Sequence, residues 1–135
     1  MAQCLFCGIV AGTVPAEVVH DGPGGVAFLD RIPAARGHTL VVPRVHAVTL
    51  QDLPDDAVGS FFQTVKEVTR KIEAALHPVA YNIGWNHGGG AGQHVFHLHV
   101  HILPRYQPGG RGIQALGSGG DRGDLAEIAA AIRGA

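Results

Sequence analysis

The chain has 135 residues, of which 46% are hydrophobic and 16% are charged. Such a chain is long enough for one domain that buries roughly two thirds of its surface without disulfides. Ten basic and eleven acidic residues give a net charge of −1, which excludes an electrostatic surface for bulk nucleic-acid binding. No apolar run approaches the roughly 20 residues of a membrane span, and the first residues lack a basic region followed by an apolar stretch. We expect a single cytoplasmic domain, 1–135, that binds neither nucleic acid nor membrane.

In the first half of the chain, short runs rich in β-branched residues are separated by segments that contain glycine and proline. These runs predict three strands in a meander, at 17–20, 26–30 and 38–42. From Leu53 to Leu76 apolar residues recur every three or four positions, which predicts one long amphipathic helix. Asp52 suits its N-cap, and Pro78 ends it.

The second half predicts two more strands and a short terminal helix. One strand is expected at 79–85, a glycine-rich loop at 86–93 and a long strand at 95–103. The glycine-rich stretch 106–123 is expected to be mobile, and 125–132 predicts a short helix. Hairpin-like strands with one late helix favour an α+β fold, an antiparallel sheet of about five strands with one long helix and a short C-terminal helix.

Nine histidines are many for this length, and three of them alternate along one predicted strand. His97, His99 and His101 share one face, because a strand alternates its faces with a period of two. Chance would produce such a triplet roughly 4% of the time. A structural role is usual for a single histidine, but it explains three in a row poorly.

The alternating histidines have two chemical interpretations. One catalytic metal held by all three is disfavoured, because the outer pair lies roughly 13 Å apart along a strand while metal–imidazole bonds are about 2 Å. Separate tasks fit better, since an imidazole is both a nucleophile and an acid or base near neutral pH. His99 has an imidazole on each side, which makes it the expected nucleophile toward phosphorus.

The stretch 97–103 resembles the histidine triad (HIT) motif, His-φ-His-φ-His-φ-φ with φ hydrophobic. The resemblance extends over nearly the whole chain, through segments 4–12, 28–30, 37–46, 86, 92–93 and 104–105. It implies a homodimer of α+β subunits, each binding a purine nucleotide such as a conjugate of AMP or GMP. It also implies hydrolysis through a nucleotidyl-histidine intermediate.

The same resemblance implies roles for particular residues. His99 is the nucleophile, His101 contacts the phosphate, and His38 supports the triad, so the catalytic set is His99, His101, His97 and His38. The expected nucleotide-binding set is Leu29, Asp30, Ile32, Asn86, Gly92, Gln93, His94 and Val95, together with His99 and His101. From the residues alone, Asp30 suits two ribose hydroxyls but is also a common turn former, and most glycine-rich loops are only turns.

The cysteine pair Cys4 and Cys7 has three interpretations. A redox pair would normally follow a strand in a βαβ unit, and no strand precedes this one. Two inert core thiols or two zinc ligands are the alternatives. HIT domains of the bacterial type that begin with Cys-x-x-Cys carry a structural zinc, and the resemblance implies that His46 and His97 complete this site.

One position departs from the family pattern. After Gly-Gln the family usually has a small hydroxyl residue that helps the leaving group depart, and this chain has His94. Its imidazole would act as an acid toward an amine or would narrow the pocket. The leaving-group preference therefore stays open.

The resemblance favours a hydrolase that cleaves nucleoside phosphoramidates or related nucleoside 5′-phosphate conjugates to a nucleoside monophosphate. A dinucleoside polyphosphate hydrolase is the first alternative. The second is a nucleotide-binding regulatory or scaffold module in which turnover is incidental. A nucleotidyltransferase is disfavoured, because that branch usually has proline where this chain has Leu98. Neither the natural leaving group nor the base is fixed by these residues.

Overall fold

The computed structural model describes residues 4–110 and 122–135. Its helices and strands follow in the order α1 (Leu5–Ala11), β1 (Val18–Gly22), β2 (Gly25–Leu29), β3 (Thr39–Val42), α2 (Asp55–Leu76), β4 (Ala80–Gly84), β5 (Val100–Arg105) and α3 (Leu125–Arg133). Two short 3₁₀ turns lie at Leu50–Asp52 and Gly89–Ala91. None of the helices within the described ranges is long and apolar enough to cross a membrane.

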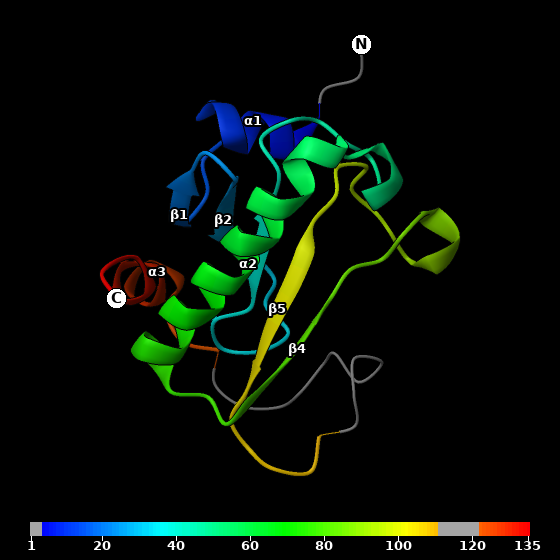
Figure 1. Cartoon of the computed structure of the whole chain (residues 1–135). Coiled ribbons are helices and arrows are strands. Elements are labelled where there is room, and N and C mark those ends of the chain that lie inside the picture. Colours follow the sequence, from blue (N-terminus) through cyan, green and yellow to red (C-terminus); the bar gives the residue numbers. More distant parts are fainter. Residues whose placement is uncertain (1–3, 111–121) are drawn as a thin grey trace.

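The five strands form one antiparallel sheet in the order β1-β2-β3-β5-β4. β5 lies between β3 and β4, so that His101 pairs with Leu40 on one side and with Gly84 on the other. The α+β fold with five antiparallel strands, one long helix and a short C-terminal helix is confirmed (Figure 1).

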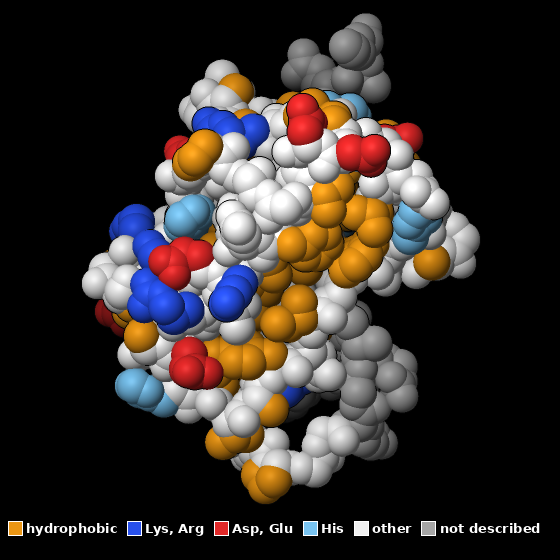
Figure 2. Space-filling model, in the orientation of Figure 1, with side chains coloured by type: hydrophobic (Ala, Val, Ile, Leu, Met, Phe, Trp, Pro, Cys, Tyr) orange, Lys and Arg blue, Asp and Glu red, His pale blue; other side chains and the backbone are white. Residues whose placement is uncertain are grey.

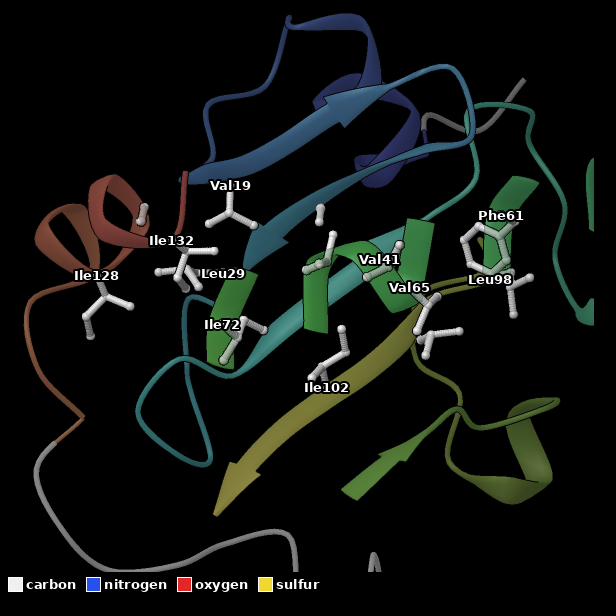
Figure 3. Packing of buried hydrophobic residues seen from close by; sticks show 14 of the residues in the cluster. Val19, Leu29, Val41, Phe61, Val65, Ile72, Leu98, Ile102, Ile128 and Ile132 are labelled. Atoms are coloured by element: carbon white, nitrogen blue, oxygen red, sulfur yellow. The ribbon is translucent and has the colours of Figure 1, made fainter. Parts of the chain in front are cut away.

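The two faces of the sheet have different covers, because side chains alternate along each strand. Ala27, Leu29 and Val41 pack into the large core beneath α2 and α3 (Figure 3). Phe28 and Leu40, from alternate positions, pack instead against α1. Val100 and Ile102 of β5 belong to the α2 side, so the intervening His101 lies on the α1 side.

Helix α2 confirms the apolar periodicity of the sequence. Phe61, Val65, Val68 and Ile72 recur at helical spacing and are buried against the sheet (Figure 3). The helix begins later than predicted: Pro54 is its N-cap, while Asp52 closes a capping box with Thr49 in the preceding 3₁₀ turn. The prediction that Asp52 caps α2 is therefore wrong, because Asp52 belongs to the 3₁₀ turn before this helix.

Strand β5 is also shorter at its start than the histidine pattern predicts. Residues 95–99 do not join the sheet ladder, and β5 begins at Val100. Contacts with residues 43–48 hold this segment instead; for example, the Leu98 N–H donates to the Ala47 carbonyl at 2.7 Å. The N-terminal stretch forms α1, which the sequence did not predict. Most of the glycine-rich stretch 106–123 lies outside the described residues.

Candidate functional site

Three separate segments bring two cysteines and two histidines together. Cys4 and Cys7 come from the first turn of α1, His46 follows β3, and His97 precedes β5. The Sγ atom of Cys4 lies 3.4 Å from Nδ1 of His97, and Sγ of Cys7 lies 3.2 Å from Nδ1 of His46 and 3.5 Å from Nδ1 of His97. All four ligand atoms lie within 4.8 Å of one another.

The geometry and the proton positions of this cluster fit zinc. The Pro43 carbonyl accepts a hydrogen bond from Nε2 of His97 at 2.9 Å, which leaves the lone pair of Nδ1 facing the sulfurs. Tetrahedral zinc with ordinary bond lengths places sulfur and nitrogen about 3.6 Å apart, close to the distances above. A closed Cys₂His₂ set has no open position for a substrate. Cys4, Cys7, His46 and His97 form a structural zinc site, as predicted.

His99 follows the zinc ligand His97 and has a defined proton arrangement. Its Nδ1 lies 2.8 Å from the His97 carbonyl, which can only accept, so Nδ1 carries the proton. The lone pair therefore sits on Nε2, for which the described residues provide no hydrogen-bond partner. Burial lowers the pKa of His99, partly offset by this hydrogen bond. The half-buried ring thus offers a neutral nucleophilic nitrogen.

His101 lies beside His99, with ring centroids 5.1 Å apart. Its Nδ1 lies 2.9 Å from Nε2 of His38, whose ring is buried beneath it. Burial, with His38 and His99 as neighbours, lowers the pKa of His101 to about 4. Oδ2 of Asp30 lies 3.7 Å from Nε2 of His38, beyond hydrogen-bond distance, while Oδ1 accepts from the Ile32 N–H at 3.0 Å. The structure therefore gathers His99, His101, His38 and Asp30 close to one another.

The glycine-rich loop is held by a buried glutamine. Oε1 of Gln93 accepts from the Gly88 N–H at 2.8 Å, and Nε2 donates to the carbonyls of Val48 and Val95. Both ends of its amide are bonded within the protein, and its predicted contact with phosphate stays a prediction. Gly92 has φ of +100°, a conformation that favours glycine, and its carbonyl accepts from the side chain of Asn86 at 3.4 Å.

The remaining predicted ligand contacts lie in different environments. Leu29 is buried in the core beneath α2 (Figure 3). By strand alternation this is the face opposite to His101. Ile32 is 85% exposed, and His94 is exposed in the segment after Gln93. Val95 is half-buried and packs with the side chains next to α1. Their contacts with a nucleotide stay predictions.

The sequence argument missed two groups that touch the histidines. Phe6 lies between the zinc cysteines in the sequence, and its ring meets His99 edge-on with centroids 5.1 Å apart. It also packs against His97 and Phe28, at 6.1 and 5.3 Å. The second group is the Pro43 carbonyl, which fixes the tautomer of His97. An apolar residue inside a Cys-x-x-Cys is a usable signal for Phe6, whereas a backbone carbonyl leaves none.

Comparisons with known proteins agree with this geometry. Residues 11–108 match the HIT domain family. A HIT-like protein of Mycoplasma pneumoniae is 42% identical over 107 residues, covering 79% of this chain and 74% of that protein. The adenosine 5′-monophosphoramidase of Schizosaccharomyces pombe is 38% identical over 103 residues, covering 76% of this chain and 74% of that enzyme.

Solved structures agree as well. The crystal structure of a Zn-bound histidine triad family protein from Mycobacterium smegmatis has a TM-score of 0.81 and 34% identity. The match covers 98% of this chain and 91% of the M. smegmatis chain. The chain belongs to the HIT family.

Proposed function

We propose that this chain hydrolyses nucleoside phosphoramidates or related nucleoside 5′-phosphate conjugates to a nucleoside monophosphate. The observation that carries the proposal is the pairing of His99, with a lone pair on Nε2, and His101 beside it. The S. pombe relative, named an adenosine 5′-monophosphoramidase, supports the substrate class. A dinucleoside polyphosphate is the alternative substrate with the same α-phosphate chemistry.

The proposed reaction has two steps. Nε2 of His99 donates its lone pair to the α-phosphorus as the bond to the leaving nitrogen breaks, and that nitrogen keeps the electron pair and takes a proton. Water then attacks the phosphorus, the N–P bond electrons return to Nε2, and a proton is released. One water is consumed, with its hydrogen on the amine and its hydroxyl on the phosphate. His101 and backbone N–H groups stabilise the added charge.

The other predicted residues have supporting roles in this proposal. Asp30 accepts hydrogen bonds from the ribose hydroxyls, and the loop from Asn86 to Gln93 borders the phosphate. His38 supports His101, and His97 holds zinc through Nδ1 while its carbonyl orients His99. Cys4, Cys7, His46 and His97 would hold the zinc, which would fix His97 in place and, with four protein ligands, would have no position for the substrate.

Turnover of adenosine 5′-phosphoramidate by the zinc-loaded protein tests this proposal. We expect release of AMP, and a loss of about 10³-fold or more in His99→Ala with zinc content and AMP binding retained. His77→Asn, which changes an exposed histidine at the end of α2, is the matched control and should retain wild-type turnover. Wild-type inactivity on both phosphoramidates and dinucleoside polyphosphates, with AMP still bound, would support the binding-module alternative.

We also propose that the chain forms a homodimer through the edge strand β4 and the neighbouring face of α2. Hydrophobic side chains gather in a band between α2 and β4 (Figure 2). Within or next to these two elements, Phe62 and Trp85 are partly buried, and Val79 and Ile83 are exposed. An unpaired strand edge next to an apolar face is typical of an interface. The occupant we favour is a second copy of this chain, since an isologous contact joins the two edges symmetrically.

Sedimentation equilibrium tests the dimer. Ile83→Asp is expected to shift the protein toward monomer at micromolar concentration. Leu5→Asp is the control, because Leu5 is exposed to the same degree, 47% against 45%, but lies on α1. A wild-type monomer, or a dimer that survives Ile83→Asp unchanged, would contradict the proposed interface.

A further inference from the structure

We propose that His101 acts as a neutral hydrogen-bond donor whose proton is held on Nε2 by a relay that begins at the backbone N–H of Ala34. The relay runs from Ala34 to His38 and from His38 to His101. The inference rests on the proposed function in one respect, that the phosphate of the ligand lies over His99 and His101. The proton positions themselves follow from the protein alone.

The first step of the relay fixes the tautomer of His38. The backbone N–H of Ala34 lies 3.0 Å from Nδ1 of His38, and an amide N–H can only donate. Nδ1 must therefore accept with its lone pair, so the neutral ring carries its proton on Nε2. The ring is 5% exposed, and burial lowers its pKa, which disfavours a second proton on Nδ1.

The second step transfers this constraint to His101. Nε2 of His38 lies 2.9 Å from Nδ1 of His101, and since Nε2 carries the proton it is the donor. Nδ1 of His101 therefore accepts, and the proton of the neutral ring stands on Nε2. Asp30 does not compete for the His38 proton, because its nearer oxygen lies 3.7 Å away.

The same contacts argue against a second metal site. Asp30, His38 and His101 bring three potential ligand atoms close together. A metal ligand must offer a lone pair, whereas Nε2 of His38 carries a proton as long as Ala34 donates to Nδ1. We therefore assign these residues to proton placement.

The relay gives two adjacent imidazoles opposite functions. The carbonyl of His97 accepts from Nδ1 of His99, so Nε2 of His99 presents a lone pair. The N–H of His38 donates to Nδ1 of His101, so Nε2 of His101 presents an N–H. A neutral imidazole N–H is a far weaker acid than an imidazolium. His101 therefore keeps its proton while it binds the phosphate oxygen, and the departing nitrogen takes its proton from another donor.

Nuclear magnetic resonance of the uniformly ¹⁵N-labelled, zinc-loaded protein tests the relay directly. Both steps are N–H···N hydrogen bonds, so we expect a ¹⁵N–¹⁵N coupling between Ala34 N and His38 Nδ1 and another between His38 Nε2 and His101 Nδ1. The protons should be attached to Ala34 N and to His38 Nε2 near pH 7. A proton found on Nδ1 of either His38 or His101 would overturn the proposal.

A matched pair of substitutions then links the proton position to turnover. In His38→Gln the amide nitrogen can still donate to His101, whereas in His38→Glu the carboxylate of similar shape can only accept. We expect Nδ1 of His101 to stay unprotonated in His38→Gln, with turnover within about tenfold of wild type. We expect it to be protonated in His38→Glu, with turnover lower by about 10²-fold, the effect of a misplaced oxyanion donor.

The relay and the proposed hydrolase can fail separately. Couplings with the expected proton positions in a protein without turnover would uphold the relay and contradict the hydrolase. His99-dependent turnover with the proton of His101 on Nδ1 would uphold the hydrolase and contradict the relay. Equal turnover in His38→Gln and His38→Glu would also contradict it, because a purely structural role of residue 38 does not distinguish a donor from an acceptor.

Discussion

Phe6 is expected to couple the zinc-binding turn to the nucleophile, and Phe6→Leu tests this. The ring makes edge-on contacts with Phe28, His97 and His99, at centroid distances of 5.3, 6.1 and 5.1 Å. Aromatic pairs of this kind contribute about 0.5–1.5 kcal/mol each beyond burial. Leucine fills much of the volume, so we expect Phe6→Leu to lower the free energy of unfolding by about 2–4 kcal/mol.

The contact with His99 sets the expected effect on catalysis. If loss of this contact raises the activation free energy by about 1 kcal/mol, turnover falls by about fivefold. The range of energies for aromatic pairs corresponds to a loss of about 2- to 13-fold. Phe28→Leu is the matched control: Phe28 is buried in the same cluster and contacts Phe6, but its ring pairs with neither histidine. We expect it to destabilise the protein with little loss of turnover.

Two assays separate these effects. Urea denaturation of the zinc-loaded variants gives the change in stability, and turnover of adenosine 5′-phosphoramidate at saturating substrate gives the change in kcat. Zinc content is measured in both variants, because Phe6 lies between two zinc ligands. An equal loss of kcat in Phe6→Leu and Phe28→Leu at full zinc occupancy would refute the coupling and leave Phe6 as core packing alone.

Three further predictions concern the zinc site, the pH dependence and the loop. Cys7→Ser should bind less than one zinc per chain and unfold at a lower temperature, as measured by metal analysis and calorimetry; unchanged zinc content would contradict the ligand set. The pKa of His101 is about 4 in the folded chain, against an ordinary value of 6.5. Between these two pH values the unfolded chain binds a proton that the folded chain does not, so the free energy of unfolding falls as the pH is lowered from 6.5 toward 4. We expect a fall of about 2 kcal/mol after allowance for the partly exposed ring. Urea curves of wild type and His101→Gln should therefore converge toward low pH, and parallel pH profiles would contradict this. Gln93→Ala leaves the Gly88 N–H without its acceptor, so we expect a loss of about 1–3 kcal/mol in the free energy of unfolding. Urea denaturation checks this value. A stability equal to that of the wild type would show that water replaces the amide.

The sequence predicted elements with a strong period and missed features that depend on backbone contacts. Helix α2 was predicted because Phe61, Val65 and Ile72 repeat at helical spacing over several turns. The start of β5 was not, because alternation from His97 to His101 resembles a strand whether or not the backbone joins a ladder. The backbone there is held by Ala47, which no pattern in the sequence indicates.

The candidate site divides in the same way. Cys4, Cys7, His46 and His97 were predicted as one cluster through the resemblance to the HIT family, and the structure brings them together. The proton positions on the histidines were not, since they depend on which backbone group faces each ring nitrogen. Three backbone groups decide them, the carbonyls of Pro43 and His97 and the N–H of Ala34.

This division explains how three histidines of one short segment differ: one is a metal ligand, one is the proposed nucleophile and one is the proposed hydrogen-bond donor. A neutral imidazole in water exchanges its proton between its two nitrogens, so neither nitrogen is fixed as the donor or the acceptor. In this protein a fixed partner on one nitrogen decides what the other offers: a lone pair to zinc from His97, a lone pair on Nε2 of His99 and an N–H on Nε2 of His101. Burial lowers the pKa of His99 and His101, so both rings remain neutral near pH 7. The roles of the histidines are therefore set by the backbone around them, and substitutions that move residues 34 or 43 should alter the chemistry without touching a histidine.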